Sequence, residues 1–90
     1  MLNLIYNLSI LRKKKAYCTE NYISDIFLEK YSITNREKEI IELLIKGKSH
    51  KEIGWDLYIS TRTVNRHVYN IYQKCKAYNL IDLINIIKSF

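Results

Sequence analysis

The sequence predicts an all-α fold, and three observations indicate that class. Apolar residues recur three and four positions apart in several segments, which is the spacing of one helix face. Two segments begin with a hydroxyl residue followed three positions later by a glutamate, a pairing that satisfies backbone groups at a helix start. The longest segment with helical spacing, a third one, sorts its apolar and its cationic residues onto opposite sides. Ninety residues are enough for one domain with a small core.

We expect residues 1–30 to be an N-terminal extension to the domain. It is apolar and then basic in sequence, and we expect it to be partly helical. The first eleven residues are mostly apolar and precede the basic run Arg12 to Lys15. A secretory signal carries its charge before its apolar stretch, and a membrane span is about twice as long, so we expect neither here. Three alternatives remain open: a helix packed on the domain or on a dimer, which we favour, a disordered arm, and a segment at a membrane surface.

The second half of this extension has a helical pattern. Apolar and aromatic residues stand at helical spacing within residues 17–31, namely Tyr22, Ile23, Ile26 and Phe27. We interpret this segment as a short helix that joins the domain by core packing.

The first capping pair, Thr34 with Glu37, predicts a helix that begins at residue 35. Its apolar face is expected to contain Ile40, Ile41 and Leu44. Gly47 stands where a residue in the left-handed conformation would end this helix.

The second capping pair, Ser49 with Glu52, predicts a shorter helix from residue 50 to about residue 57. Gly54 lies inside this helix, where glycine costs about 1 kcal/mol relative to alanine. We therefore expect another backbone to approach closely at Gly54. Two residues then leave room only for a tight turn.

Ser60, a preferred N-cap residue, predicts the start of a long helix over about residues 60–75. One face is an apolar stripe made of Val64, Val68, Ile71 and Cys75. The opposite face carries Arg62, Asn65, Arg66, Tyr69, Gln73 and Lys76. No carboxylate occurs between Leu57 and Ile81, so this face suits an anionic partner, although charge alone also fits an ordinary solvated surface. Helix, tight turn and second helix with a basic face form a helix-turn-helix.

A fourth helix is predicted over residues 80–89, with Asn79 as its N-cap. Its apolar arc spans about 220°, far more than the roughly 100° that one core contact needs. A second copy of the same helix is the favoured cover, since most soluble oligomers are two-fold symmetric. The predicted dimer interface consists of Leu80, Ile81, Ile84 and Ile87. Contact with the first thirty residues is the alternative.

With these elements, the chain resembles the LuxR-type (GerE-like) helix-turn-helix family of bacterial transcription regulators. The run ITNREKEIIELLIKGKSHKEIGWDLYISTRTVNRHVYNIYQK follows the pattern of that family almost position for position. With the last helix, the resemblance covers residues 31–90. It implies a four-helix DNA-binding domain, LuxR/GerE-type, whose third helix lies in the major groove, usually as a dimer.

The resemblance also implies roles for single residues. The positions that face bases in the family are Asn65, Arg66 and Tyr69. The positions that hold the phosphate backbone or orient the helix are Lys51, Ser60, Thr61, Thr63 and His67, to which Arg62 is added from its place on the basic face. Independently, Arg66 suits a bidentate contact with guanine and Asn65 one with adenine, each worth about 1 to 3 kcal/mol of discrimination.

The chain departs from the family pattern at several positions. The family commonly has lysine where Asn65 stands and alanine where Gly54 stands. It has leucine and glycine where this chain has Cys75 and Lys76, and then an arginine where this chain has Leu80. These departures favour a different loop before the last helix and a more apolar surface on it.

Most members of the family carry a large sensory domain ahead of the helix-turn-helix, for which ninety residues leave no room. We therefore expect a small single-domain member. The leading hypothesis is a sequence-specific regulator that binds double-stranded DNA as a homodimer. The alternative is an interaction protein that pairs with a full-length regulator and inhibits it. RNA polymerase or another regulator is a further candidate partner.

Composition bounds the remaining possibilities. The net charge is +6, and most of the excess lies after residue 33. The two histidines and two cysteines form no catalytic or metal-binding pattern, and no glycine-rich phosphate loop is present, so we expect no enzyme activity, no metal and no cofactor. Cys75 is interpreted as a small buried apolar residue. A reduced, cytoplasmic setting, associated with the bacterial nucleoid, fits best.

Overall fold

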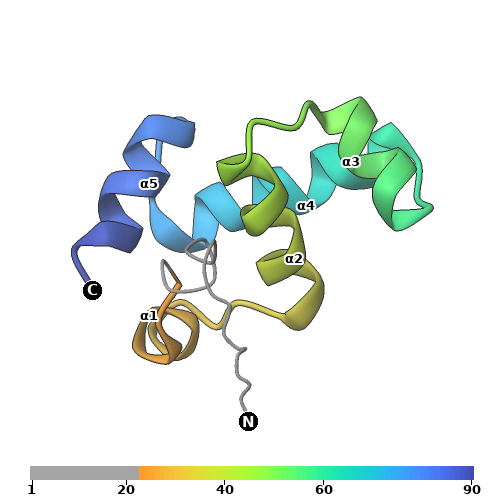
Figure 1. Cartoon of the computed structure of the whole chain (residues 1–90). Helices are drawn as coiled ribbons and strands as arrows, with labels where there is room; N and C mark the ends of the chain where they lie inside the picture. Colours follow the sequence, from red (N-terminus) through yellow and green to blue (C-terminus); the bar gives the residue numbers. More distant parts are fainter. Residues whose placement is uncertain (1–22) are drawn as a thin grey trace, which may run out of the picture.

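A computed structural model describes residues 23–90 of the chain. The regular secondary structure of this part of the chain consists of α-helices joined by turns, which confirms the predicted all-α class. The helices are α1 (Asp25–Lys30), α2 (Asn35–Ile45), α3 (His50–Leu57), α4 (Thr61–Cys75) and α5 (Leu80–Lys88), as Figure 1 shows.

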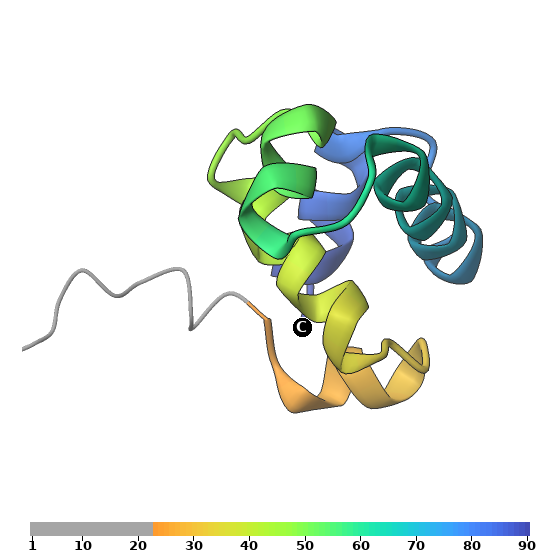
Figure 2. The same cartoon turned by 90° about the vertical axis from the view of Figure 1, so that its right-hand side faces the viewer.

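Helix α4 is the longest helix and packs against α2, α3 and α5. It runs behind the other helices, with α3 near its first end and α5 near its second (Figure 1). In the view of Figure 2, α4 is seen nearly along its axis, beside α2 and α3. The predicted helix-turn-helix is therefore formed by α3 and α4, and the remaining helices hold this pair in place.

A single cluster of apolar side chains forms the core of the described region, and all five helices contribute to it. The stripe predicted for α4 is buried along its whole length. Full burial of a valine or isoleucine side chain contributes roughly 1.5 to 3 kcal/mol to the stability of the folded state. Fully buried examples from the five helices in chain order are Phe27, Ile40, Ile53, Ile71 and Leu83.

Both predicted capping boxes are present. In α2, the backbone N–H of Thr34 donates to Glu37 Oε1 at 3.0 Å, and the N–H of Glu37 donates to Thr34 Oγ1 at 3.1 Å. In α3, the corresponding distances between Ser49 and Glu52 are 2.9 and 3.1 Å. Each pair satisfies two backbone donors and so fixes where its helix begins. The first residues predicted for both helices are therefore confirmed.

Four turns in residues 23–90 contain a residue with positive φ. Gly47, which follows α2, has φ of 89°, as predicted for a left-handed helix end. At the ends of α1, α3 and α4, the same role falls to Ser32, Tyr58 and Lys76, with φ between 54° and 58°. A residue other than glycine costs roughly 1 to 2 kcal/mol in this conformation, because its Cβ atom crowds the backbone, so these three turns are strained.

Helix α1 begins later than the helix predicted over residues 17–31. Ser24 Oγ accepts a hydrogen bond from the backbone N–H of Phe27 at 3.1 Å, and this cap makes Asp25 the first helical residue. Ile23 and Phe27 are buried, which confirms the predicted core packing for these two residues, whereas Ile26 is 66% exposed and does not pack in the core. The expectations for residues 1–22 lie outside the described residues. Within residues 23–90, no helix is both long and apolar enough to cross a bilayer.

The last residues of the chain return to α1. The ring of Phe90 lies 5.7 Å from the ring of Phe27 and 5.9 Å from that of Tyr31, measured between centroids. Phe27, one of the first thirty residues, thus contacts Phe90 just after the end of α5. Ile87 is only 1% exposed, so its assignment to a dimer surface is corrected: with Leu83, one helical turn earlier, it faces the core of its own domain.

Candidate nucleic-acid interface

The turn between α3 and α4 is built around Gly54. A Cβ atom at this position would lie 2.7 Å from the carbonyl oxygen of Ile59, closer than van der Waals contact allows. The expected close approach of a second backbone is therefore confirmed. Tyr58 reverses the chain in the left-handed conformation, and the N–H of Ile59 donates to the carbonyl of Gly54 at 3.0 Å. These contacts bring α4 directly against α3.

The first turn of α4 presents backbone donors to solvent. Ser60 caps the helix, because its Oγ accepts from the N–H of Thr63 at 3.0 Å and also lies 2.9 Å from Thr63 Oγ1. Thr61 and Arg62 are exposed, and N–H groups in the first turn have no partner within a helix. This end of α4 carries no acidic residue, so it suits an oxygen anion such as phosphate.

The predicted base-facing side chains lie on the outer face of α4. Asn65, Arg66 and Tyr69 are all exposed, and 62% of the Tyr69 surface is accessible to solvent. His67 and Thr63 are partly buried at the edges of this face. We call the set of Arg62, Asn65, Arg66 and Tyr69 the reading face.

The cations near the reading face are not neutralised by carboxylates. The ion pairs found in residues 23–90 involve Arg36, Lys48 and Lys74. None of them includes Arg62, Arg66 or Lys51. Lys51 on α3 is exposed, and its ammonium lies 5.5 Å from the centre of the Trp55 ring in a cation–π contact. The charges of this region are therefore available to a polyanion.

One hydrogen bond at the reading face did not follow from the sequence. His50 Nδ1 in α3 lies 2.6 Å from Asn65 Oδ1 in α4. An amide oxygen only accepts, so the histidine nitrogen carries the proton and donates it. The residues are fifteen positions apart, and the contact depends on the angle between two helices, which no periodic pattern in the sequence records.

The far end of α4 is fixed by Lys74. Its Nζ donates to Glu37 Oε1 at 2.7 Å and to the carbonyl of Ser32 at 2.8 Å. Burial alone would raise the pKa of Glu37, but the hydrogen bond and charge of Lys74, together with the bonds from Thr34, outweigh it and lower that pKa. This ion pair anchors the end of α4 to the start of α2.

Cys75, the last residue of α4, is buried in the core. Burial, together with the charge of Glu37, raises the pKa of its thiol to about 11, although the charge of Lys74 opposes this. The thiol is therefore protonated at neutral pH and packs as a small apolar group, in agreement with the sequence-based interpretation.

The surface predicted for dimer contact lies on α5. Ile81 is 72% exposed, while Leu80 and Ile84 are partly buried. Tyr78, just before the helix, is 92% exposed. Leu80, Ile81 and Ile84 therefore form an apolar patch on the outer side of α5, and the buried Ile87 is not part of it.

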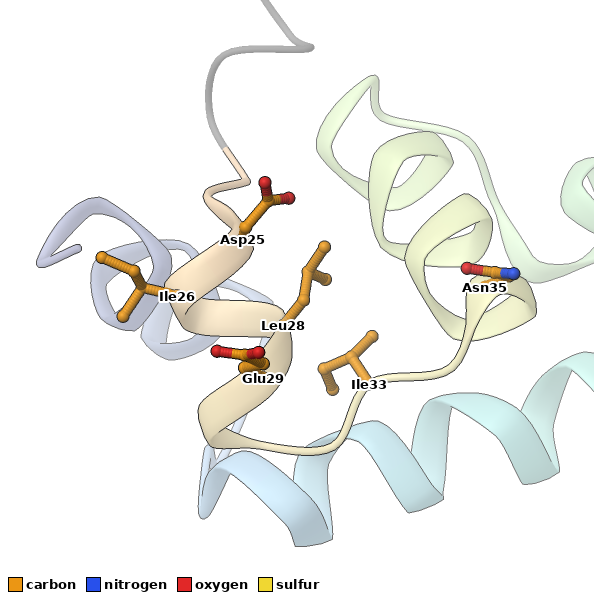
Figure 3. A pocket seen from close by; sticks show the side chains of 6 residues that line it. All are labelled: Asp25, Ile26, Leu28, Glu29, Ile33 and Asn35. Carbon is orange, nitrogen blue, oxygen red and sulfur yellow. The ribbon is translucent and has the colours of Figure 1, made fainter.

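A separate shallow pocket lies between α1 and the start of α2 (Figure 3). Leu28 and Ile33 point into the gap between these segments, and Asp25 and Glu29 flank them. No cation lines this pocket. Two carboxylates would repel phosphate, so this hollow lies outside the candidate nucleic-acid interface.

Comparison with known proteins agrees with this geometry. The profile of the family described as "Bacterial regulatory proteins, luxR family" matches residues 31–87. The transcriptional regulatory protein DesR of Bacillus subtilis is 36% identical over 76 residues, which are 84% of this chain and 38% of DesR. The spore germination protein GerE of Bacillus subtilis is 46% identical over 48 residues, which are 53% of this chain and 65% of GerE.

The chain thus spans less than two thirds of the length of these relatives. No solved structure matches it significantly. The matched segment contains the helix-turn-helix, the capping box of α2 and nearly all of α5, and it extends over more than half of the chain. On this basis, the chain belongs to the luxR family of bacterial regulatory proteins.

Proposed function

We propose that this domain binds double-stranded DNA in a sequence-specific manner and regulates transcription, with α4 in the major groove. The observation that carries the proposal is the reading face, an exposed row of two arginines, an asparagine and a tyrosine on a helix without carboxylates. The major groove is about 12 Å wide and admits one α-helix. Family membership supports the proposal, and it identifies a regulatory protein rather than an enzyme, as the sequence predicted.

Within this proposal, side chains divide into two groups. Asn65, Arg66 and Tyr69 contact base edges, and Arg66 suits the two acceptors of guanine. The donors that surround them contact phosphates and set the register of the helix without reading sequence. This second group contains Lys51, Ser60, Thr61, Arg62, Thr63 and His67.

The proposal includes a homodimer formed through α5. Ile81, with Leu80 and Ile84, provides an apolar patch that a second copy would cover by two-fold symmetry. Such a dimer would place two copies of α4 on half-sites about one helical turn of DNA apart. The site of action would then be the bacterial nucleoid.

A binding selection with random-sequence duplexes tests the proposal. Arg66→Ala should relax base preference at one position of each half-site, because a bidentate contact worth about 1 to 3 kcal/mol is lost. Lys51→Ala should weaken binding to all sequences alike and reduce the salt slope by about one. Arg36→Ala is the matched control, since it removes an arginine from α2 that pairs with Glu39 at 3.5 Å.

An enriched motif that degrades in Arg66→Ala but not in Arg36→Ala supports a specific regulator. Retention without enrichment, falling steeply with salt, contradicts sequence-specific binding.

The second candidate function is an inhibitor that pairs with a full-length regulator through α5. The exposed apolar patch on α5 is the observation that favours it. Such an inhibitor would keep its activity after loss of Arg62 and Arg66 but would lose it in Ile81→Asp. A DNA-binding regulator would lose its activity in the arginine variants as well.

A further inference from the structure

The hydrogen bond between His50 and Asn65 restricts what Asn65 can read. To contact adenine through two hydrogen bonds, an asparagine accepts from N6 with its oxygen and donates to N7 with its nitrogen. In this structure, Oδ1 of Asn65 already accepts from His50 Nδ1 at 2.6 Å. The bond turns the oxygen toward α3, so the NH₂ group, on the other side of the planar amide, points away from His50.

We infer that His50 is a positioning residue that holds Asn65 as a hydrogen-bond donor and thereby sets its base preference. A donor fits guanine, whose major-groove edge offers N7 and O6 as acceptors. It fits adenine less well, because the amino group at N6 is itself a donor. The inference rests on the proposed function and replaces the adenine contact that the sequence predicted for Asn65.

The bond has little other structural purpose. Asn65 is exposed and His50 only partly buried, so water competes for both groups and the bond contributes little to folding. The pairing of α3 with α4 is already fixed by the close approach at Gly54 and by the buried side chains of Ile53 and Val64. The main effect of the bond is therefore on the orientation of the Asn65 amide.

The experiment compares two substitutions of His50. His50→Leu removes the donor, and His50→Asn places an amide nitrogen near the position of Nδ1 and can keep the bond. Half-site duplexes that carry guanine or adenine at the position facing Asn65 serve as probes. That position is identified as the one at which Asn65→Ala loses its base preference.

We expect the wild-type domain to prefer guanine at this position. In His50→Leu, the preference for guanine over adenine should fall by about three- to tenfold, the size of one hydrogen bond. His50→Asn should retain it. The preference at the position read by Arg66 should not change in either variant, which separates positioning from a general loss of binding.

A double-mutant cycle completes the test. In the Asn65→Ala background, His50→Leu should have no further effect on base preference, because residues that act through one contact are not additive. Circular dichroism and thermal unfolding verify that each variant is folded.

The outcomes separate the two proposals. If the wild type is specific and His50→Leu leaves its base preference unchanged, or weakens all sequences equally, the inference about His50 is overturned and the proposed function stands. If the wild type shows no sequence preference at all, the proposed function fails, and the inference fails with it.

Discussion

Lys76 shows how one side chain can conflict with its backbone. It ends α4 with φ of 56°, a conformation that glycine adopts without strain. The resemblance to the LuxR-type family had marked this position, because the family commonly has glycine there. The structure supplies the physical reason for that glycine, which the sequence pattern alone did not state.

Lys76→Gly should therefore stabilise the domain by about 0.5 to 1 kcal/mol, since relief of left-handed strain exceeds the entropy cost of glycine. The measurement is thermal unfolding, in which about 1 kcal/mol shifts Tm by about 4 to 8 °C for a domain of this size. Lys76→Ala is the control, because it removes the charge and keeps the strain. Equal stability of both variants would contradict the explanation.

Glu37 and Lys74 make stability depend on pH. The folded-state pKa of Glu37 is lowered below its usual value of 4.5. A carboxyl with a lowered pKa contributes stability above its unfolded pKa, and this contribution is lost as pH falls through the folded value. The domain should therefore lose stability progressively below about pH 4.5.

Urea unfolding at pH 7 and at pH 3 tests this expectation. Glu37→Gln should show a smaller loss between the two pH values than the wild type, because its amide does not titrate in this range. Glu39→Gln is the matched control, since Glu39 is exposed and pairs with Arg36 at the surface. An identical pH dependence in the wild type and Glu37→Gln would exclude Glu37 as the source.

At the scale of helices, the sequence was most informative where a helix start is defined by side chains a few residues apart. The capping boxes of α2 and α3 were predicted from such pairs, and the Ser60 cap of α4 and the Asn79 cap of α5 from a single residue of a type preferred at a helix start. The start of α1 was not predicted, because helical spacing in residues 17–31 does not reveal the Ser24 cap.

Contacts between helices explain the remaining differences. The apolar arc of α5 did not show which residues face the core, and packing within the domain leaves Ile87 buried while Ile81 is exposed. The bond from His50 to Asn65 depends in the same way on the crossing of α3 and α4. Such contacts are set by tertiary packing, which local spacing does not encode.

At the scale of the whole molecule, the apolar patch on α5 makes a testable prediction about assembly. Ile81→Asp should convert a dimer into a monomer, because it places a charge at the centre of the proposed contact. Ile81 is 72% exposed, so the fold of the monomer should be retained. Sedimentation of the wild type and the variant measures the change.

Ile26→Asp is the matched control for this prediction. Ile26 is 66% exposed on α1, so the same substitution adds the same charge away from α5. The control should sediment like the wild type. A wild-type protein that sediments as a monomer at high concentration would contradict the proposed homodimer.

The buried thiol of Cys75 can be used to measure local unfolding at the end of α4. A protonated thiol inside a packed core does not react with alkylating reagents, since the thiolate is the reactive form. Reaction at Cys75 therefore requires that the end of α4 detach from α2 and α5. In a Cys18→Ser background, the rate of labelling would measure how often the end of α4 detaches, and a rate that falls when DNA is added would show that bound DNA makes this detachment rarer.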